Sequence, residues 1–120
     1  MKKISGVVSI TEYKPQTIFA DDTEFNGDLN FKNPVEIKGK FKGKIYTESV
    51  VIISEDGMVE ADIKANIVII AGTVKGNVEA KKKVEILSTG KLYGDIKTAK
   101  LKIADGVIFE GSCHMIKDEN

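Results

Sequence analysis

The side chains able to do metal or covalent chemistry are few in this chain. The single cysteine and the single histidine are adjacent, Cys113 and His114, whereas a closed zinc site needs four such ligands. Carboxylates such as Asp62 and Asp95 recur singly, without the paired arrangement of an acid and a base that catalysis requires. The residues therefore predict no metal site, no cofactor and no catalytic centre.

A run of three lysines, residues 81–83, resembles a basic patch for nucleic acid. Such a patch would also carry aromatic side chains on which bases stack, and none accompanies this run. The 18 basic and 18 acidic residues of the chain cancel, so no overall field attracts a polyanion. We interpret the run as a solvated loop between strands and expect no nucleic-acid partner.

Composition favours one folded domain in a reducing compartment. The chain has 120 residues, 42% of them hydrophobic, which suits a single globular unit. It contains no apolar run long enough to cross a bilayer, and the residues after Lys2 and Lys3 are too polar for a secretory signal. A lone cysteine excludes a disulfide framework within the chain. These features predict a cytoplasmic protein.

The elements that position these side chains form an internal repeat, which is the main signal in the sequence. Its unit is an apolar residue, any residue, glycine, any residue, and a second apolar residue, followed by a short apolar strand and a turn with glycine. Ten of the 11 glycines occupy these two slots. The units begin at residues 25, 41, 59, 74, 92 and 109, so they recur every 15 to 18 residues: FNGDLNF, FKGKIYT, VEADIKA, VKGNVEA, LYGDIKT and FEGSCHM.

This period predicts an all-β solenoid, a parallel β-helix of about six coils over residues 17–115. Strands of this length are unstable alone, but stacked on the next coil they form parallel ladders around a common core. Parallel crossovers favour a right-handed winding. We expect the first glycine slot to mark a corner with close backbone approach and the second to adopt positive φ. Residues 1–16 and 116–120 are predicted to be tails, the first of them flexible.

Two apolar stretches, residues 50–53 and 67–70, leave the direction of their side chains open. If Val50, Ile52 and their equivalents point inward, an exposed apolar patch results, and it offers a lateral contact with a second copy of the chain, a membrane or a partner. Its residues are Val51, Ile53, Val68, Ile70 and Leu87. The alternative is that the coil bends there and tucks Ile53, Ile70 and Leu87 inside.

The whole ladder resembles the bactofilins, a family of bacterial polymer-forming cytoskeletal proteins. The resemblance covers residues 17–115 and rests on TEFNGDLNF, VEIKGKFKGKI, VEADIKA, TVKGNVEA and KLYGDIKTAKLKIADGVIFEGSCHM. It implies a right-handed β-helix that polymerises end to end without nucleotide. Some members attach to the membrane through an N-terminal tail, and some recruit cell-wall enzymes that set cell shape. An aromatic residue in the last coil is needed for assembly in the family, and Phe109 matches it.

The repeat itself supplies a physical reason for polymerisation. A β-solenoid has two open edges, which most proteins cover with a cap. Neither flank of this repeat reads as a capping helix, so we expect both ends to be adhesive. At the C-terminal end the expected contact residues are Phe109, Cys113 and Met115, with Ile108 beside them; at the N-terminal end they are Ile18 and Phe19. Alternatively, Phe109 only fills the terminal core.

The first residues form a small basic and apolar segment that resembles the membrane-attaching tails of the family. They are Lys2, Lys3, Ile4, Val7 and Val8. Two lysines on a short segment bind lipid weakly unless a filament multiplies the contact. The alternative is a disordered leader without lipid contact.

A hexapeptide-repeat acyltransferase, with a left-handed β-helix, is the alternative from another class. Such enzymes repeat strictly every six residues and need a catalytic histidine. Here the spacing drifts, and His114 lies at an outward position near the end of the chain. We therefore expect a scaffold that is not an enzyme.

Overall fold

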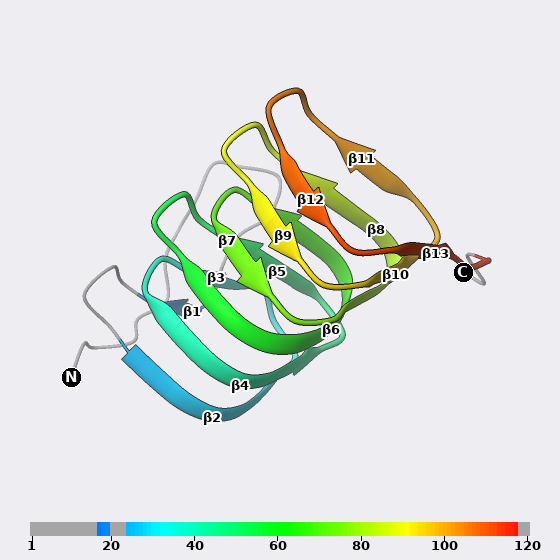
Figure 1. Ribbon diagram of the computed structural model, residues 1–120. Helices are drawn as coiled ribbons and strands as arrows, with labels where there is room; N and C mark the ends of the chain where they lie inside the picture. The colour runs from blue at the N-terminus through cyan, green and yellow to red at the C-terminus, as the bar shows by residue number, and fades with distance from the viewer. Residues whose placement is uncertain (1–16, 20–23, 118–120) are drawn as a thin grey trace, which may run out of the picture.

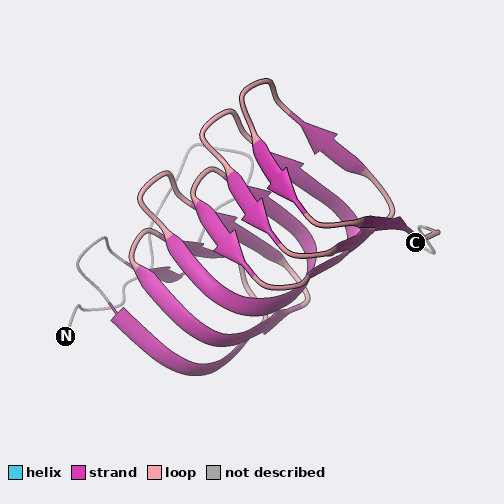
Figure 2. Ribbon diagram, in the orientation of Figure 1, coloured by secondary structure: helices cyan, strands magenta, loops and turns pink. Residues whose placement is uncertain are grey.

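The computed structural model describes residues 17–19 and 24–117; of Thr17–Phe19 and Phe31 it gives the backbone only. The described residues form thirteen β-strands and no helix (Figure 2). In chain order the strands are β1 (Thr17–Phe19), β2 (Glu24–Phe31), β3 (Val35–Ile37), β4 (Lys40–Thr47), β5 (Val50–Ile53), β6 (Met58–Ile70), β7 (Thr73–Lys75), β8 (Val78–Ile86), β9 (Lys91–Tyr93), β10 (Ile96–Thr98), β11 (Leu101–Ile103), β12 (Ile108–Glu110) and β13 (Cys113–Met115).

The strands make three walls of a prism, and the strands of each wall are parallel. The first wall contains the first halves of β2 and β4, the start of β6, and then β7, β9 and β12. The second continues through the middle of β6 and the start of β8 to β10 and β13. The third contains β1, β3, β5, the ends of β6 and β8, and β11. In Figure 1 the near strands run rightward, the far strands return, and each coil lies above the last, so the winding is right-handed.

The six units of the sequence repeat lie on one another in register, which confirms the predicted parallel β-helix. Phe25 pairs with Phe41 and Phe41 with Val59. The same column continues through Val74 and Leu92 to Phe109. The six stacked rungs enclose about five full turns. Alternate side chains of each strand point inward, where they form one continuous hydrophobic core.

Glycine forms the corner between the first and second walls. Gly43 has φ +136°, and a Cβ placed on it would collide with the carbonyl oxygen of Gly27 in the preceding coil. A side chain is therefore excluded twice, by the backbone dihedral and by the neighbouring rung. The close approach predicted for this slot is confirmed.

The second glycine slot behaves differently from its prediction. Gly57, Gly72 and Gly90 do not have positive φ, and Gly106 alone of this slot does. Small size is what these positions require: a Cβ on Gly57 would lie 2.5 Å from the carbonyl oxygen of Ile37 in the coil below. The prediction of positive φ is therefore wrong for Gly57, Gly72 and Gly90 and confirmed for Gly106. At the first three positions glycine is required because the turns of successive coils pack on one another.

The prediction of an exposed apolar patch on the third wall is also wrong. Val51, Ile53, Val68 and Ile70 are fully buried, whereas Leu87 is 37% exposed. In these two stretches the side chains that point outward are those of Ile52 and Ile69, which are half-buried. The alternative bend therefore holds for Ile53 and Ile70, and not for Leu87. All four residues of each stretch are apolar, so alternation alone does not set which pair faces inward.

Candidate functional site

The C-terminal coil leaves its inward side chains uncovered by any described residue. Ile86 is fully buried, while Ile103, which is stacked on it, is 46% exposed. Thr98 is fully buried, while Met115 above it is 56% exposed. The side chains that would form the core in an inner coil thus form an apolar surface at this end.

Three of the predicted contact residues lie together on that surface. Phe109 is half-buried and stacks over Leu92 of the coil below. Cys113 is also half-buried, and its Sγ lies 3.6 Å from Sδ of Met115. Ile108 is 41% exposed but belongs to an outward row, above Lys91. Phe109, Cys113 and Met115 therefore form part of the apolar surface at this end, and Ile108 lies at its rim.

Sequence reasoning missed two members of this surface, both from β11. Leu101 is half-buried and packs against the core, and Ile103 lies beside it. Their equivalents one coil below, Val84 and Ile86, are fully buried. The repeat carried the signal, because LKIADG is the last of the strand-and-turn segments and nothing described follows it on that wall. We call Leu101, Ile103, Phe109, Cys113 and Met115 the terminal surface.

At the N-terminal end, β2 is the first rung of the first wall. Phe25 is half-buried and stacks on Phe41, with ring centroids 5.2 Å apart and planes 7° from parallel. The backbones of Ile18 and Phe19 pair with Glu36 and Ile37, which places β1 as the first rung of the third wall. The side chains of Ile18 and Phe19, and the residues of the predicted membrane tail, lie outside what the structure describes.

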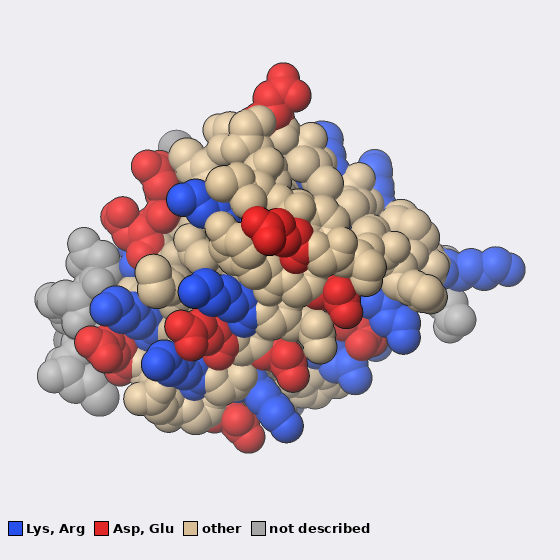
Figure 3. All heavy atoms as spheres, in the orientation of Figure 1, with Lys and Arg blue, Asp and Glu red and all other residues tan. Residues whose placement is uncertain are grey.

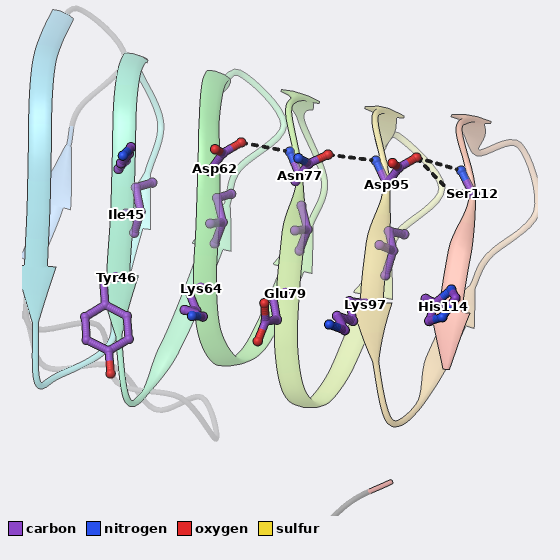
Figure 4. Close-up of a pocket in the computed structure, with 14 residues that line it drawn as sticks. Ile45, Tyr46, Asp62, Lys64, Asn77, Glu79, Asp95, Lys97, Ser112 and His114 are labelled. Carbon is purple, nitrogen blue, oxygen red and sulfur yellow. Dashed lines mark hydrogen bonds between the residues drawn. The ribbon is translucent and has the colours of Figure 1, made fainter. Parts of the chain in front are cut away.

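The second wall carries a shallow groove of about 760 Å³ that crosses several coils (Figure 4). One side of it is a ladder of hydrogen bonds between successive coils. Asn77 N donates to Asp62 Oδ1 at 3.2 Å, and Asp95 N donates to Asn77 Oδ1 at 3.4 Å. Ser112 N then donates to Asp95 Oδ1 at 3.1 Å. Each rung thereby supplies an acceptor for a backbone N–H that follows the glycine corner of the next.

The opposite side of the groove is a row of outward side chains with alternating charge. It runs Tyr46, Lys64, Glu79, Lys97 and His114 (Figure 4). His114 is exposed, and its side chain makes no hydrogen bond with another described residue. The carboxylates of Asp62 and Asp95 are engaged in the ladder, so the groove presents no paired acid and base.

Among residues 17–19 and 24–117, no group of three or more His, Cys, Asp or Glu side chains is arranged to hold a metal ion. The same part of the chain contains no helix long and apolar enough to cross a membrane.

Comparison with known proteins gives matches over most of the chain. A family model described as "Bactofilin: Polymer-forming cytoskeletal" matches residues 17–114. Bactofilin BacO of Myxococcus xanthus is 35% identical over 105 residues, which cover 88% of this chain and 83% of that protein. Bactofilin BacP of the same organism is 27% identical over 99 residues, which cover 82% of this chain and 41% of that protein.

A solved structure matches as well, a cryo-EM reconstruction of Thermus thermophilus bactofilin double helical filaments. The TM-score is 0.77 and the identity 32%, with 81% of this chain and 96% of that chain covered. A hexapeptide-repeat acyltransferase is not favoured by any of these matches. The register of the coils, the glycine corner and the family match over residues 17–114 lead to one conclusion: this chain belongs to the bactofilins, a polymer-forming cytoskeletal family.

Proposed function

We propose that this chain is a scaffold subunit that assembles end to end into filaments through its terminal surface, without bound nucleotide. The observation that carries this proposal is the contrast between inner and terminal coils. Ile86 and Thr98 are fully buried, whereas Ile103 and Met115 in the same columns are 46% and 56% exposed. A second copy placed on this end would bury them.

The chemistry of the terminal surface supports assembly by two means. Burying a large apolar side chain stabilises a contact by about 1.5–3 kcal/mol, and five apolar or sulfur side chains are available here. The edge strands β11, β12 and β13 also present backbone groups that pair readily with another chain. Ile18 and Phe19, in the first rung of the third wall, are the proposed contact at the opposite end.

The remaining parts of the function follow from the family and are proposals for this chain. We infer a cytoplasmic protein without enzymatic activity, which acts at the inner face of the membrane and recruits cell-wall or cell-shape factors. The segment with Lys2, Lys3, Ile4, Val7 and Val8 is the proposed membrane tail. Its mixture of basic and apolar residues supports this role.

Negative-stain electron microscopy of the purified chain without nucleotide tests assembly. The native chain should form filaments, and Phe109→Arg should not, because a charge would be buried at the contact. Phe109 is half-buried, so Ile103→Arg is the second variant, at a position that is already 46% exposed. Met58→Arg is the matched control, because Met58 is 42% exposed on the side of the rod.

The circular dichroism of all variants should remain that of a β-protein. Filaments that persist in Phe109→Arg and Ile103→Arg would refute the terminal surface as the contact. A monodisperse native chain would refute polymerisation itself.

A further inference from the structure

The corner between the second and third walls is basic in its later coils. Lys81 and Lys82 connect the two walls within β8, and both are exposed. Lys100 is exposed at the same corner of the next coil, between β10 and β11. Neighbouring coils are about 4.8 Å apart, so the three lysines lie close together at one corner of adjacent coils. We call Lys81, Lys82 and Lys100 the lysine corner.

The backbone of this corner is fixed. Lys100 O accepts hydrogen bonds from Val84 N at 2.9 Å and from the buried hydroxyl of Thr98 at 3.3 Å. The lysines are therefore presented from a rigid edge of the rod, and only their side chains need to adapt to a partner.

The charge of the lysine corner is not neutralised by described carboxylates. Within the described part of the chain, ion pairs join Lys42 to Glu60 and Lys83 to Glu85, and none involves the corner. The opposite corner, between the third and first walls, carries Glu55, Asp56 and Asp105 in its turns. In Figure 3 red spheres lie at the upper left, over these turns, whereas the right-hand edge carries blue spheres, with some red ones among them lower down.

Shape decides which anionic partner fits. The lysine corner is a convex edge, and the acidic corner of another copy is convex as well, so the two would touch over little area. A nucleic-acid site would need a groove with stacking aromatics, and the corner has neither. A lipid surface with anionic headgroups accepts a straight row of lysines, each of which strengthens binding.

The wall next to the corner adds apolar surface. Ile67 and Ile69 are half-buried on the third wall, and Ile67 is stacked against Lys83 of the next coil. Basic residues beside exposed apolar ones are typical of surfaces that lie in the headgroup layer.

We propose that the lysine corner binds anionic lipid headgroups along the side of the rod, independently of the N-terminal tail. Binding by one copy is weak. The filament of the proposed function multiplies it, because every subunit places the same corner in a row. The rod axis then lies parallel to the membrane, with the acidic corner turned away from it.

Flotation of the full chain with vesicles of equal parts phosphatidylglycerol and phosphatidylcholine tests this, since vesicles float whereas free filaments sink. The native chain should float, and the triple variant Lys81→Gln, Lys82→Gln, Lys100→Gln should bind about a hundredfold less, from about fivefold for each lysine. The corresponding triple arginine variant should float like the native chain. At about 1 M salt, where the Debye length is about 3 Å, flotation that depends on the corner should disappear.

The matched control is Lys40→Gln, Lys75→Gln, Lys91→Gln, which removes three exposed lysines of the first wall. It should float like the native chain. Equal flotation of both glutamine variants would overturn the proposal, as would a native chain that forms filaments and fails to float. Binding to duplex DNA that is lost in the corner variant, without vesicle binding, would assign the corner to nucleic acid instead.

Electron microscopy of the same samples separates the two proposals. Filaments should form in both glutamine variants, because neither changes the terminal surface. If the native chain forms no filaments, the proposed function fails, and the difference between the two variants on vesicles still decides the role of the corner.

Discussion

Asp95 accepts two hydrogen bonds from Ser112, which lies in the next coil: one from the backbone N–H at 3.1 Å and one from the hydroxyl at 2.9 Å, both to Oδ1. This pair closes the ladder that begins at Asp62. It ties the terminal coil, which carries the terminal surface, to the rest of the rod.

We predict that Asp95→Ala lowers the free energy of unfolding by about 1 kcal/mol, because two donors lose a charged acceptor at a solvent-exposed site. Asp95→Asn should lose less, because its amide oxygen can still accept. Urea denaturation followed by circular dichroism measures this. Glu79→Ala is the control, since the side chain of Glu79 makes no hydrogen bond with another described residue, and an equal loss in the control would contradict the ladder's role.

Gly43→Ala should destabilise the fold by at least about 2 kcal/mol. The added Cβ meets the carbonyl of Gly27, at a φ of +136° that side chains rarely adopt. Ala61 occupies the same column without positive φ, so Ala61→Gly should cost only about 0.5–1 kcal/mol. Thermal unfolding of both variants checks the difference, and similar melting temperatures would argue against a steric requirement at the corner.

The third wall gives a test of register from two adjacent residues. Ile70 is fully buried and Ile69 is half-buried. Ile70→Ala should cost about 2–5 kcal/mol, which is typical of cavity formation in a core, and Ile69→Ala well under half as much. Denaturation midpoints in urea decide between them, and the reverse order would restore the register in which Ile70 faces outward.

The ion pair between Lys42 and Glu60 should matter little for stability. Its atoms are 3.9 Å apart, and its side chains are 65% and 44% exposed. Glu60→Gln is expected to change the free energy of unfolding by less than about 0.5 kcal/mol, with the change vanishing at high salt. A change above about 1 kcal/mol in urea titrations at two salt concentrations would contradict this and show that the ion pair stabilises the rod.

The fold could be predicted from the sequence because its signal repeats six times. Each apolar-x-Gly-x-apolar unit predicts the same corner. Alignment of the units with one another therefore gives the pairing of Phe25 with Phe41 and of Leu92 with Phe109. The bactofilin resemblance, which rests on the same repeat units, implies the same fold.

The errors arose where the local signal was ambiguous. VVII and IVII, residues 50–53 and 67–70, carry apolar side chains in both registers. The neighbouring coils resolve this, because Val35-Glu36-Ile37 and Val84-Glu85-Ile86 have a charged middle residue that must face water, and they pair with Val51–Ile53 and Val68–Ile70. The terminal surface was anticipated at Phe109, Cys113 and Met115 but not at Ile103, because only the glycine-containing half of the last coil was considered.

The ladder was missed for a different reason. Asp62, Asn77, Asp95 and Ser112 differ in charge and in side-chain type, so no pattern in the sequence groups them. What they share is a side-chain oxygen at the position after the corner, and the need for it appears only once the backbone N–H of the next coil is placed.

Each rung of this rod contacts only the rung before it and the rung after it, through columns that repeat the same residue types. The number of rungs can therefore vary without a change in the fold. Duplication of one middle coil would lengthen the rod by one strand spacing and leave the residues at its two ends unaltered. The length of the subunit and the residues of its end-to-end contact can therefore change separately, in evolution or by engineering.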